Sequence, residues 1–439
     1  MSLTIPDKIR MFREKLYDKA KDEPDFRFYQ LYDKVYREDI LRYAWYVSRA
    51  NGGAPGVDGV RFADIEAEGL EEWLKGLQKE LHDKTYRPSA VRRVMIPKAG
   101  GGERPLGIPT IRDRVAQTAV KLVIEPIFEA DFEDSAHGYR PGRSALDAVR
   151  LTHESLREGY TDVVDADLSK YFDNIPHDKL MWAVRQRITD VHLLKLIQMW
   201  LKVPVEERDE KGKRRITGGK RNDKGTPQGG VISPLLANIY MNLYLKQWRT
   251  KEKGREYKAR IVNYADDLVI LSKGRGADAL EWTRRIMGKM GLSLNEDKTR
   301  IVNAAKESFN FLGYTFGPRI YKAGGGRMKT AWPSDKSVQR IKDKVGSILK
   351  PGNMEPWPKV AETLNQTLGG WKNYFSYGDT YKSYRAINNY VCHKVRFFLN
   401  RRCKKSKLDL NGLSHKVFGE LGVTSMNRDS RRAASVGRS

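Results

Sequence analysis

The sequence predicts an α+β fold in which strands around acidic residues are followed by a helical region. Two apolar runs, 259–263 and 268–271, flank a pair of aspartates, which is typical of a strand, a tight turn and a second strand. Another strand is predicted over 161–168, where acidic and apolar residues alternate. From Val338 onward the apolar residues change to helical spacing, so the last part of the chain is expected to be helical.

The composition limits both the architecture and the partners. At 439 residues the chain is too long for one compact core, so two or three domains are expected. Its formal net charge of +26 and pI near 9.8 indicate a large polyanion as partner, because basic side chains release counterions when they neutralise phosphates. The mean hydropathy of −0.63, the lack of a long apolar stretch and the lack of a signal-peptide core argue against a membrane or secreted protein.

The N-terminal half contains a helical and a hairpin signal. Residues 1–50 are charged, and apolar residues such as Phe28 and Leu31 recur near helical spacing, so the segment is expected to be helical. The polar stretch 206–224 is rich in lysine, arginine and glycine, which predicts a long β-hairpin or loop. That hairpin either touches a template or is simply solvated.

Three helices are predicted after residue 330. The first has an apolar face, prolines then break the pattern, and Gly369 and Gly370 are expected to interrupt the second helical run. A third helix is predicted around Val391. Aromatic rings are interleaved with basic residues there, and about half of them at most are expected to stack on RNA while the others form core. These rings are Trp371, Tyr374, Phe375, Tyr377, Tyr381 and Tyr384.

The C-terminal tail is strongly basic. From His393 onward it carries twelve lysines and arginines against three acidic residues, so we expect it to bind DNA or RNA. The candidate contacts are Lys404, Lys405 and Lys407. The end from Thr424 is expected to be disordered.

The acidic strand and the acidic turn together predict a metal centre. Asp165 and Asp167 lie on one face of the strand, and Asp266 and Asp267 occupy the tip of the hairpin. Adjacent carboxylates repel each other, and Mg²⁺ relieves that repulsion because it prefers carboxylate oxygens and substrate phosphates. Either motif alone is more often a surface turn or a capped loop. Together they suit two-metal phosphoryl transfer, which needs carboxylates that bridge ions roughly 3.5–4 Å apart.

These two motifs belong to an ordered series of sequence blocks along the chain. They are Asn51 to Gly59, Ile96-Pro97-Lys98, Arg104 to Pro109, Asp113 to Gln117, His137-Gly138-Tyr139-Arg140-Pro141, Asp167-Leu168-Ser169-Lys170-Tyr171-Phe172-Asp173, Gly225-Thr226-Pro227-Gln228-Gly229-Gly230, Tyr264-Ala265-Asp266-Asp267, Asn295 to Thr299 and Phe311-Leu312-Gly313-Tyr314. With these blocks the chain resembles the reverse transcriptases encoded by bacterial group II introns, often called maturases.

The resemblance implies a right-hand polymerase. Residues 1–50 would be an N-terminal extension that either touches template and intron RNA or packs on the fingers. Fingers and palm, an antiparallel sheet backed by helices, would occupy 51–320. An α-helical thumb, domain X, would occupy 330–400, and 401–439 would be the basic tail.

The resemblance also assigns site residues. Asp167, Asp266 and Asp267 would be catalytic and would hold two Mg²⁺ ions, and the main-chain carbonyl of Leu168 would complete one ion's shell. One ion would lower the pKa of the primer 3′-hydroxyl, and the other would neutralise the departing pyrophosphate. Asp165 would either support this site or simply be solvated.

Five further residues are implied to bind the incoming nucleotide. Phe172 would lie where a ribose 2′-hydroxyl would be and so exclude rNTPs, although a phenylalanine at such a turn is more often plain core. Lys98 and Arg104, in a glycine-rich hairpin, would clamp the triphosphate or else be solvent-exposed turn residues. Gln228 would contact the nucleotide, and Lys298 would protonate pyrophosphate.

The implied function is an RNA-directed DNA polymerase of a mobile intron. It would extend a DNA primer on an RNA template with dNTPs, bind group II intron RNA to assist splicing, insert DNA at a target site (retrohoming), and reside in the bacterial cytoplasm or nucleoid. Alternatives are a domesticated reverse transcriptase in defence or DNA repair, and an RNA-binding splicing factor without polymerase activity. Many relatives carry a C-terminal H-N-H endonuclease with cysteine pairs. This chain has only Cys392 and Cys403, so that domain is not expected after residue 400.

Overall fold

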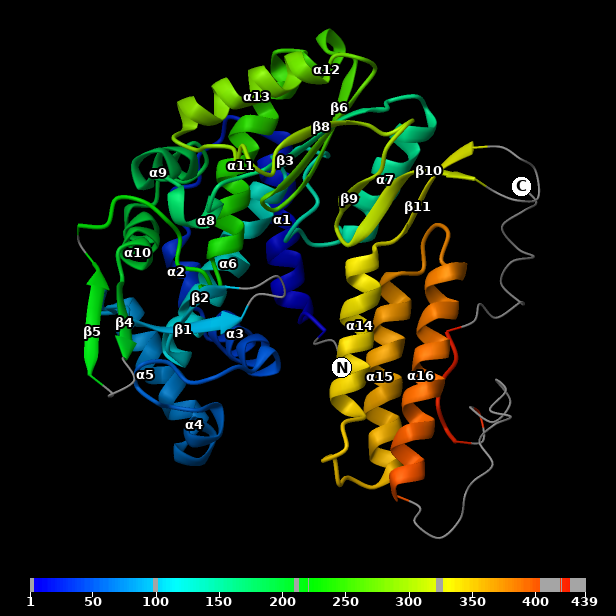
Figure 1. Cartoon of the computed structure of the whole chain (residues 1–439). Coiled ribbons are helices and arrows are strands. Elements are labelled where there is room, and N and C mark those ends of the chain that lie inside the picture. Colours follow the sequence, from blue (N-terminus) through cyan, green and yellow to red (C-terminus); the bar gives the residue numbers. More distant parts are fainter. Residues whose placement is uncertain are drawn as a thin grey trace. The chain divides into compact units, whose positions relative to one another are not determined.

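The computed structural model divides into two compact units (Figure 1). It describes residues 4–97, 102–208, 213–219, 221–320, 327–402, 419 and 421–426. Unit 1 comprises Met1–Ser144, Ala166–Ile270 and Ala277–Arg300, and unit 2 comprises Ala145–Asp165, Leu271–Gly276 and Ile301–Ser439. Four predicted site residues lie outside the described residues, namely Lys98, Lys404, Lys405 and Lys407.

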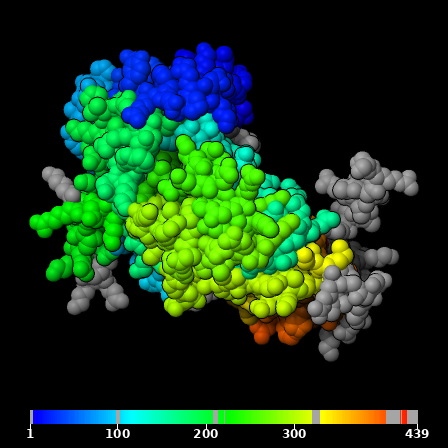
Figure 2. Space-filling view, turned by 90° about the horizontal axis from the view of Figure 1, so that it is seen from above, coloured from blue at the N-terminus to red at the C-terminus, as the bar shows by residue number. Residues whose placement is uncertain are grey.

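The N-terminal segment of unit 1 is helical, as predicted, but with a break. Its helices are α1 (Asp7–Asp22), α2 (Tyr32–Val35) and α3 (Glu38–Asn51), which form the blue surface in Figure 2. The expectation that Phe28 lies on a helix is wrong. Its backbone forms a parallel bridge with Ile188, in which the Phe28 N–H donates to Arg187 at 2.8 Å and the Thr189 N–H donates to the Phe28 carbonyl at 2.8 Å. Long-range strand pairing therefore overrides the local helical spacing.

A mixed sheet and a buried helix follow in unit 1. Helices α4 (Phe62–Glu68) and α5 (Leu70–His82) precede a sheet of order β2-β1-β4-β5. Helix α6 comes directly after β2 in the chain. The strand and helix bounds are β1 (Val91–Pro97), β2 (Glu103–Ile108), β4 (Pro204–Arg208), β5 (Arg214–Gly218) and α6 (Ile111–Glu129). Strands β4 and β5 pair antiparallel, which confirms the predicted hairpin. Helix α6 is buried along most of its length and is capped by Thr110, whose hydroxyl accepts from the Asp113 N–H at 3.2 Å.

The acidic strands belong to a second four-stranded sheet of order β6-β7-β3-β8. Its strands are β3 (Asp162–Asp167), β6 (Ala259–Tyr264), β7 (Asp267–Ser272) and β8 (Arg300–Asn303). The accompanying helices are α8 (Tyr171–Asn174), α9 (His177–Arg185), α10 (Val191–Leu201), α11 (Ser233–Thr250), α12 (Lys253–Glu256) and α13 (Gly276–Met290). The strand, turn and strand around the paired aspartates are confirmed. Because β7 is the neighbour of β3, the two acidic motifs belong to adjacent strands.

Unit 2 joins a small antiparallel sheet to three helices. It contains α7 (Ala145–Arg157), the sheet β11-β10-β9, and α14 (Asp335–Ile348), α15 (Trp357–Tyr374) and α16 (Tyr381–Arg402). The strands are β9 (Phe309–Phe311), β10 (Tyr314–Ile320) and β11 (Arg327–Pro333). The three predicted helices are confirmed, but Gly369 and Gly370 do not interrupt α15, which passes through both. No helix within the described ranges is long and apolar enough to cross a membrane.

The core of unit 2 corrects one expectation about the end of the chain. Met426 is 1% exposed in the core of the three helices, and its N–H donates to Asn388 at 2.9 Å, so the disorder expected from Thr424 is wrong for residues 424–426. The six rings proposed to share RNA contact with packing differ in burial. Phe375 and Tyr384 are buried, Tyr381 is 70% exposed, and Trp371, Tyr374 and Tyr377 are half-buried. Contact of the accessible rings with RNA stays a prediction.

Candidate active site

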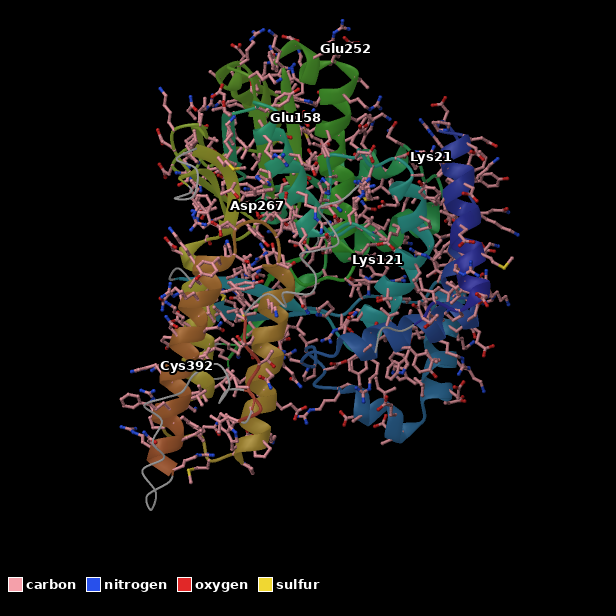
Figure 3. The ribbon with its side chains drawn as sticks, turned by 90° about the vertical axis from the view of Figure 1, so that its right-hand side faces the viewer. Lys21, Lys121, Glu158, Glu252, Asp267 and Cys392 are labelled. Carbon is pink, nitrogen blue, oxygen red and sulfur yellow. The ribbon has the colours of Figure 1, made fainter. Side chains whose placement is uncertain are left out.

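The acidic turn between β6 and β7 is held by one buried asparagine. Asn263 is 1% exposed, and its Nδ2 donates to the carbonyls of Ala265 at 2.9 Å and Asp267 at 3.2 Å. Ala265 takes a left-handed conformation, with φ of 58°, which makes the turn tight. Asp266 is half-buried and Asp267, labelled in Figure 3, is exposed at the first position of β7. The turn therefore presents two carboxylates at the surface of unit 1.

Asp167 ends β3 and is braced by the segment before β8. The Asn295 N–H donates to the Asp167 carbonyl at 2.8 Å, and the Ser169 N–H donates to Ser293 at 2.9 Å. These two bonds flank Leu168, so its own carbonyl takes no part in that pairing. Lys298 lies 3.2 Å from Asp167, measured from Nζ to Oδ2. The structure thus brings Lys298 to the carboxylate proposed to hold a metal.

The donor set suits a hard divalent cation, although the side chains are not gathered into a coordination shell. Within the described ranges, no group of three or more His, Cys, Asp or Glu side chains could hold a metal. Carboxylates are the ligands that Mg²⁺ prefers, and the Asp167 side chain is 35% exposed and paired with a lysine. An ammonium group beside the carboxylate supplies positive charge where an ion would. The site therefore fits a divalent cation by the chemistry of its ligands and not by their arrangement.

A loop from the His137 block packs directly against the acidic turn. The His137 N–H donates to the Asn263 carbonyl at 2.8 Å, and Asn238 donates from Nδ2 to the Gly138 carbonyl at 2.7 Å. Any side chain at Gly138 would overlap the backbone of Ala265, so this position requires glycine. The loop places Tyr139 beside the carboxylates.

The environment of Tyr139 links the acidic turn to the β1–β2 hairpin. Burial raises the pKa of the Tyr139 phenol, and the nearby Asp266 carboxylate raises it further, while Arg104 lowers it. The negative charge of Asp266 also raises the pKa of Tyr171, for which burial is the larger cause. These electrostatic effects require Asp266 and α8 to be near each other. The sequence predicted no role for Tyr139, and its only signal was its place in the His137 block, one of the blocks that carry the family resemblance.

Phe172 is buried among aromatic rings in α8. It is 6% exposed, and its ring centroid lies 5.7 Å from that of Tyr171 and 6.4 Å from that of Tyr139, both in edge-to-face geometry. The sequence left two interpretations open, a sugar gate and plain core. The burial adds a core contribution, so removing this ring is expected to cost more stability than trimming a ring at an open pocket.

The glycine-rich loop 225–230 is hydrogen-bonded both to α8 and to strand β2. On one side the Thr226 N–H donates to the Phe172 carbonyl at 2.7 Å, and on the other the Gly107 N–H donates to the Gln228 carbonyl at 2.6 Å. A side chain at Gly229, whose φ is +106°, would overlap the Gly107 carbonyl. Backbone therefore meets backbone, and only glycine fits.

The side chain of Gln228 bridges two charged groups across this loop. Arg104 donates from Nε to Gln228 Oε1 at 2.9 Å, and Gln228 donates from Nε2 to Asp173 Oδ1 at 3.0 Å. The structure thus brings together Arg104 and Gln228, two of the predicted nucleotide-binding residues. It adds Asp173, for which the sequence predicted no role beyond its place in the Asp167 block.

Two protein families match consecutive parts of the chain. Residues 96–316 match the family described as reverse transcriptase (RNA-dependent DNA polymerase), and residues 338–416 match the group II intron, maturase-specific domain. The chain belongs to the reverse transcriptase family and carries a maturase-specific domain. This confirms the predicted enzyme class, and the antiparallel strands and helices agree with the predicted right-hand polymerase fold.

Individual relatives are similar over most of the chain. Protein YkfC of Escherichia coli (strain K12) is 34% identical over 366 residues, which cover 75% of this chain and 93% of that protein. Group II intron-encoded protein LtrA of Lactococcus lactis subsp. cremoris is 30% identical over 404 residues, covering 76% of this chain and 65% of LtrA. An uncharacterized 91 kDa protein in cob intron of Schizosaccharomyces pombe is 26% identical, covering 68% of this chain and 45% of that protein.

Proposed function

We propose that this reverse transcriptase copies an RNA template into DNA at the centre formed by Asp167, Asp266 and Asp267. The observation that carries the proposal is the placement of the two acidic motifs on neighbouring strands β3 and β7. Two Mg²⁺ ions held there, with the Leu168 carbonyl as a further ligand, would activate the primer 3′-hydroxyl and neutralise the departing pyrophosphate. The protein supplies the carboxylates and, through Asn263 and the segment 293–299, holds them in place.

The nucleotide would bind between the acidic turn and the β1–β2 hairpin. Arg104, together with Lys98, would bind its triphosphate, because guanidinium and ammonium groups offset phosphate charge. Gln228 would contact the nucleotide from the loop that also touches Phe172. Phe172 would exclude a ribose 2′-hydroxyl, so dNTPs would be the substrates. Lys298 would donate a proton to pyrophosphate from its position beside Asp167.

The maturase-specific domain supports a second role on intron RNA. With a net charge of +26, the chain is suited to a phosphate-rich partner. We propose that it binds the group II intron RNA encoded with it, assists splicing, and primes cDNA synthesis at a DNA target. Contacts from Lys404, Lys405 and Lys407 belong to this part of the proposal. A splicing assay with the flanking intron distinguishes this role from a domesticated enzyme, which would polymerise but not promote splicing.

Primer extension with Asp266→Ala tests the catalytic centre. Loss of one metal-holding carboxylate is expected to reduce extension by at least roughly 10³-fold, corresponding to about 4 kcal/mol of transition-state stabilisation. Binding to a structured RNA should stay near the wild-type value. Asp18→Ala, which removes an exposed carboxylate on α1, is the matched control and should extend normally. Substantial synthesis by Asp266→Ala would exclude Asp266 from the metal centre.

A further inference from the structure

We infer that Tyr139 is a positioning residue for the sugar gate, and that its ring holds the ring of Phe172 against the deoxyribose of the incoming nucleotide. The inference rests on the proposed role of Phe172. It gives the His137 block, residues 137–141, a role in nucleotide selection.

Phe172 lies between two aromatic rings of different character. Tyr171 is 2% exposed and donates its hydroxyl to the Ala237 carbonyl at 2.7 Å, so it is a fixed part of the core. Tyr139 lies 6.4 Å from Phe172 by ring centroids, with an interplanar angle of 78°, and is 48% exposed. Of the two aromatic neighbours of Phe172, Tyr139 is therefore the one that solvent and substrate can reach.

The backbone of Tyr139 is strained for a bulky residue. Its φ is +57°, in the left-handed region where glycine or asparagine is favoured and an aromatic residue is not. A half-exposed ring gains less from burial than a core ring does, so packing alone is a weak reason for tyrosine at this position. Strain of this kind persists where the surrounding structure fixes it, and it often marks functional positions. Here the fixing contacts are those of His137 and Gly138 with the acidic turn.

The same contacts tie the position of Tyr139 to the catalytic carboxylates. Gly138 is in backbone contact with Ala265, next to Asp266, and Asn238 holds the Gly138 carbonyl at 2.7 Å. Arg140, the next residue, donates from Nη2 to Glu129 at 2.6 Å and so anchors the other end of the loop. Because both ends of the loop are fixed, the backbone of Tyr139 has little freedom to move, and the ring pair with Phe172 orients its side chain. The gate would thereby keep a constant distance from the reacting centre.

The backbone strain provides an experiment in which stability and selectivity move in opposite directions. Tyr139→Gly removes the ring and relieves the strained φ, so its melting temperature should stay level or rise. Its discrimination, the ratio of kcat/KM for a dNTP to that for the matching rNTP, should fall roughly three- to ten-fold, the range expected from an edge-to-face ring pair. Tyr139→Phe keeps the ring and should retain discrimination within about two-fold. Tyr139→Asn also tolerates left-handed backbone and serves if the glycine variant does not fold.

A matched control and the Phe172 variant separate the possible results. Lys84→Gly relieves a similar φ of +60° at an exposed site after α5 and should leave discrimination unchanged. Phe172→Val should lower discrimination, and adding Tyr139→Gly to it should change little further, since both act through one gate. If Phe172→Val lowers discrimination but Tyr139→Gly and Tyr139→Asn do not, the inference about Tyr139 is wrong. If Phe172→Val leaves discrimination unchanged, the proposed gate fails, and the inference fails with it.

Discussion

Asp173 is expected to orient Arg104 through Gln228, and Asp173→Ala tests this arrangement. The Gln228 amide is held at both ends, with Nε2 donating to Asp173 at 3.0 Å and Oε1 accepting from Arg104 at 2.9 Å. The carboxylate therefore determines which way the amide faces. Without it the amide could turn, and the guanidinium would lose its fixed acceptor. Asp173 would thus act on the nucleotide through two other side chains.

The size of the effect follows from the exposure of the groups. Asp173 and Arg104 are exposed, so their contribution is below the roughly 1.5–3 kcal/mol of hydrogen bonds to charged groups in buried sites. A loss of about 1 kcal/mol in nucleotide binding raises the KM for dNTP by about five-fold. The free energy of unfolding should change by only about 0.5 kcal/mol, because an exposed pair contributes little to stability.

Steady-state primer extension at varied dNTP concentration measures this effect. Asp173→Ala should raise KM with kcat nearly unchanged, and Asp173→Asn, which keeps an oxygen acceptor, should restore most of the affinity. Combining Asp173→Ala with Arg104→Ala should cost little more than Arg104→Ala alone, since the two act in series. Fully additive effects, or an unchanged KM in Asp173→Ala, would refute the reasoning.

Three other perturbations follow from the structure. Lys298→Met removes the ammonium that would compete with Mg²⁺ for Asp167. In a Mg²⁺ titration, half-maximal extension should then need about two- to five-fold less Mg²⁺. An unchanged or higher Mg²⁺ requirement would contradict this competition. Gly378→Ala, at φ +74° with the Ala331 carbonyl in the path of a Cβ, should lower the melting temperature by roughly 5–10 °C, while Gly352→Ala, with open space around it, should not. Burial lowers the pKa of His153, so unfolded chains take up its proton more readily and stability should fall as pH drops below about 6.5. His153→Gln should flatten that dependence in melting curves from pH 7.5 to 5; an equal slope in both proteins would contradict it.

Local chemistry made the acidic strands predictable from the sequence. Apolar runs on both sides of the aspartate pair identify the strand, turn and strand around Asp266, and the period of two in β3 likewise places Asp167 on a strand. Helix α14 was predictable because its apolar face repeats with the helical period. In each case the signal lies within about ten residues along the chain.

The failures came from contacts between residues far apart in the sequence. Phe28 pairs with Ile188, so its helical spacing was misleading. Two glycines inside α15 are tolerated because Leu364 and Leu368 bury the helix on the core. Neither Tyr139 nor Asp173 carried a signal of its own, since each acquires its neighbours only when the turn, the glycine-rich loop and α8 come together.

The glycine-to-backbone contact between Gly229 and Gly107 has a mechanical consequence. With no side chain between them, and with the Gly107 N–H donating to the Gln228 carbonyl at 2.6 Å, loop 225–230 and β2 are joined directly through their backbones. A nucleotide-driven bend of the β1–β2 hairpin would therefore need its hinge farther out, between Gly107 and the exposed Arg104. A side chain at Gly229 would push the loop away from β2. The position of Arg104 relative to the loop would then change, although no group that contacts the triphosphate had been replaced.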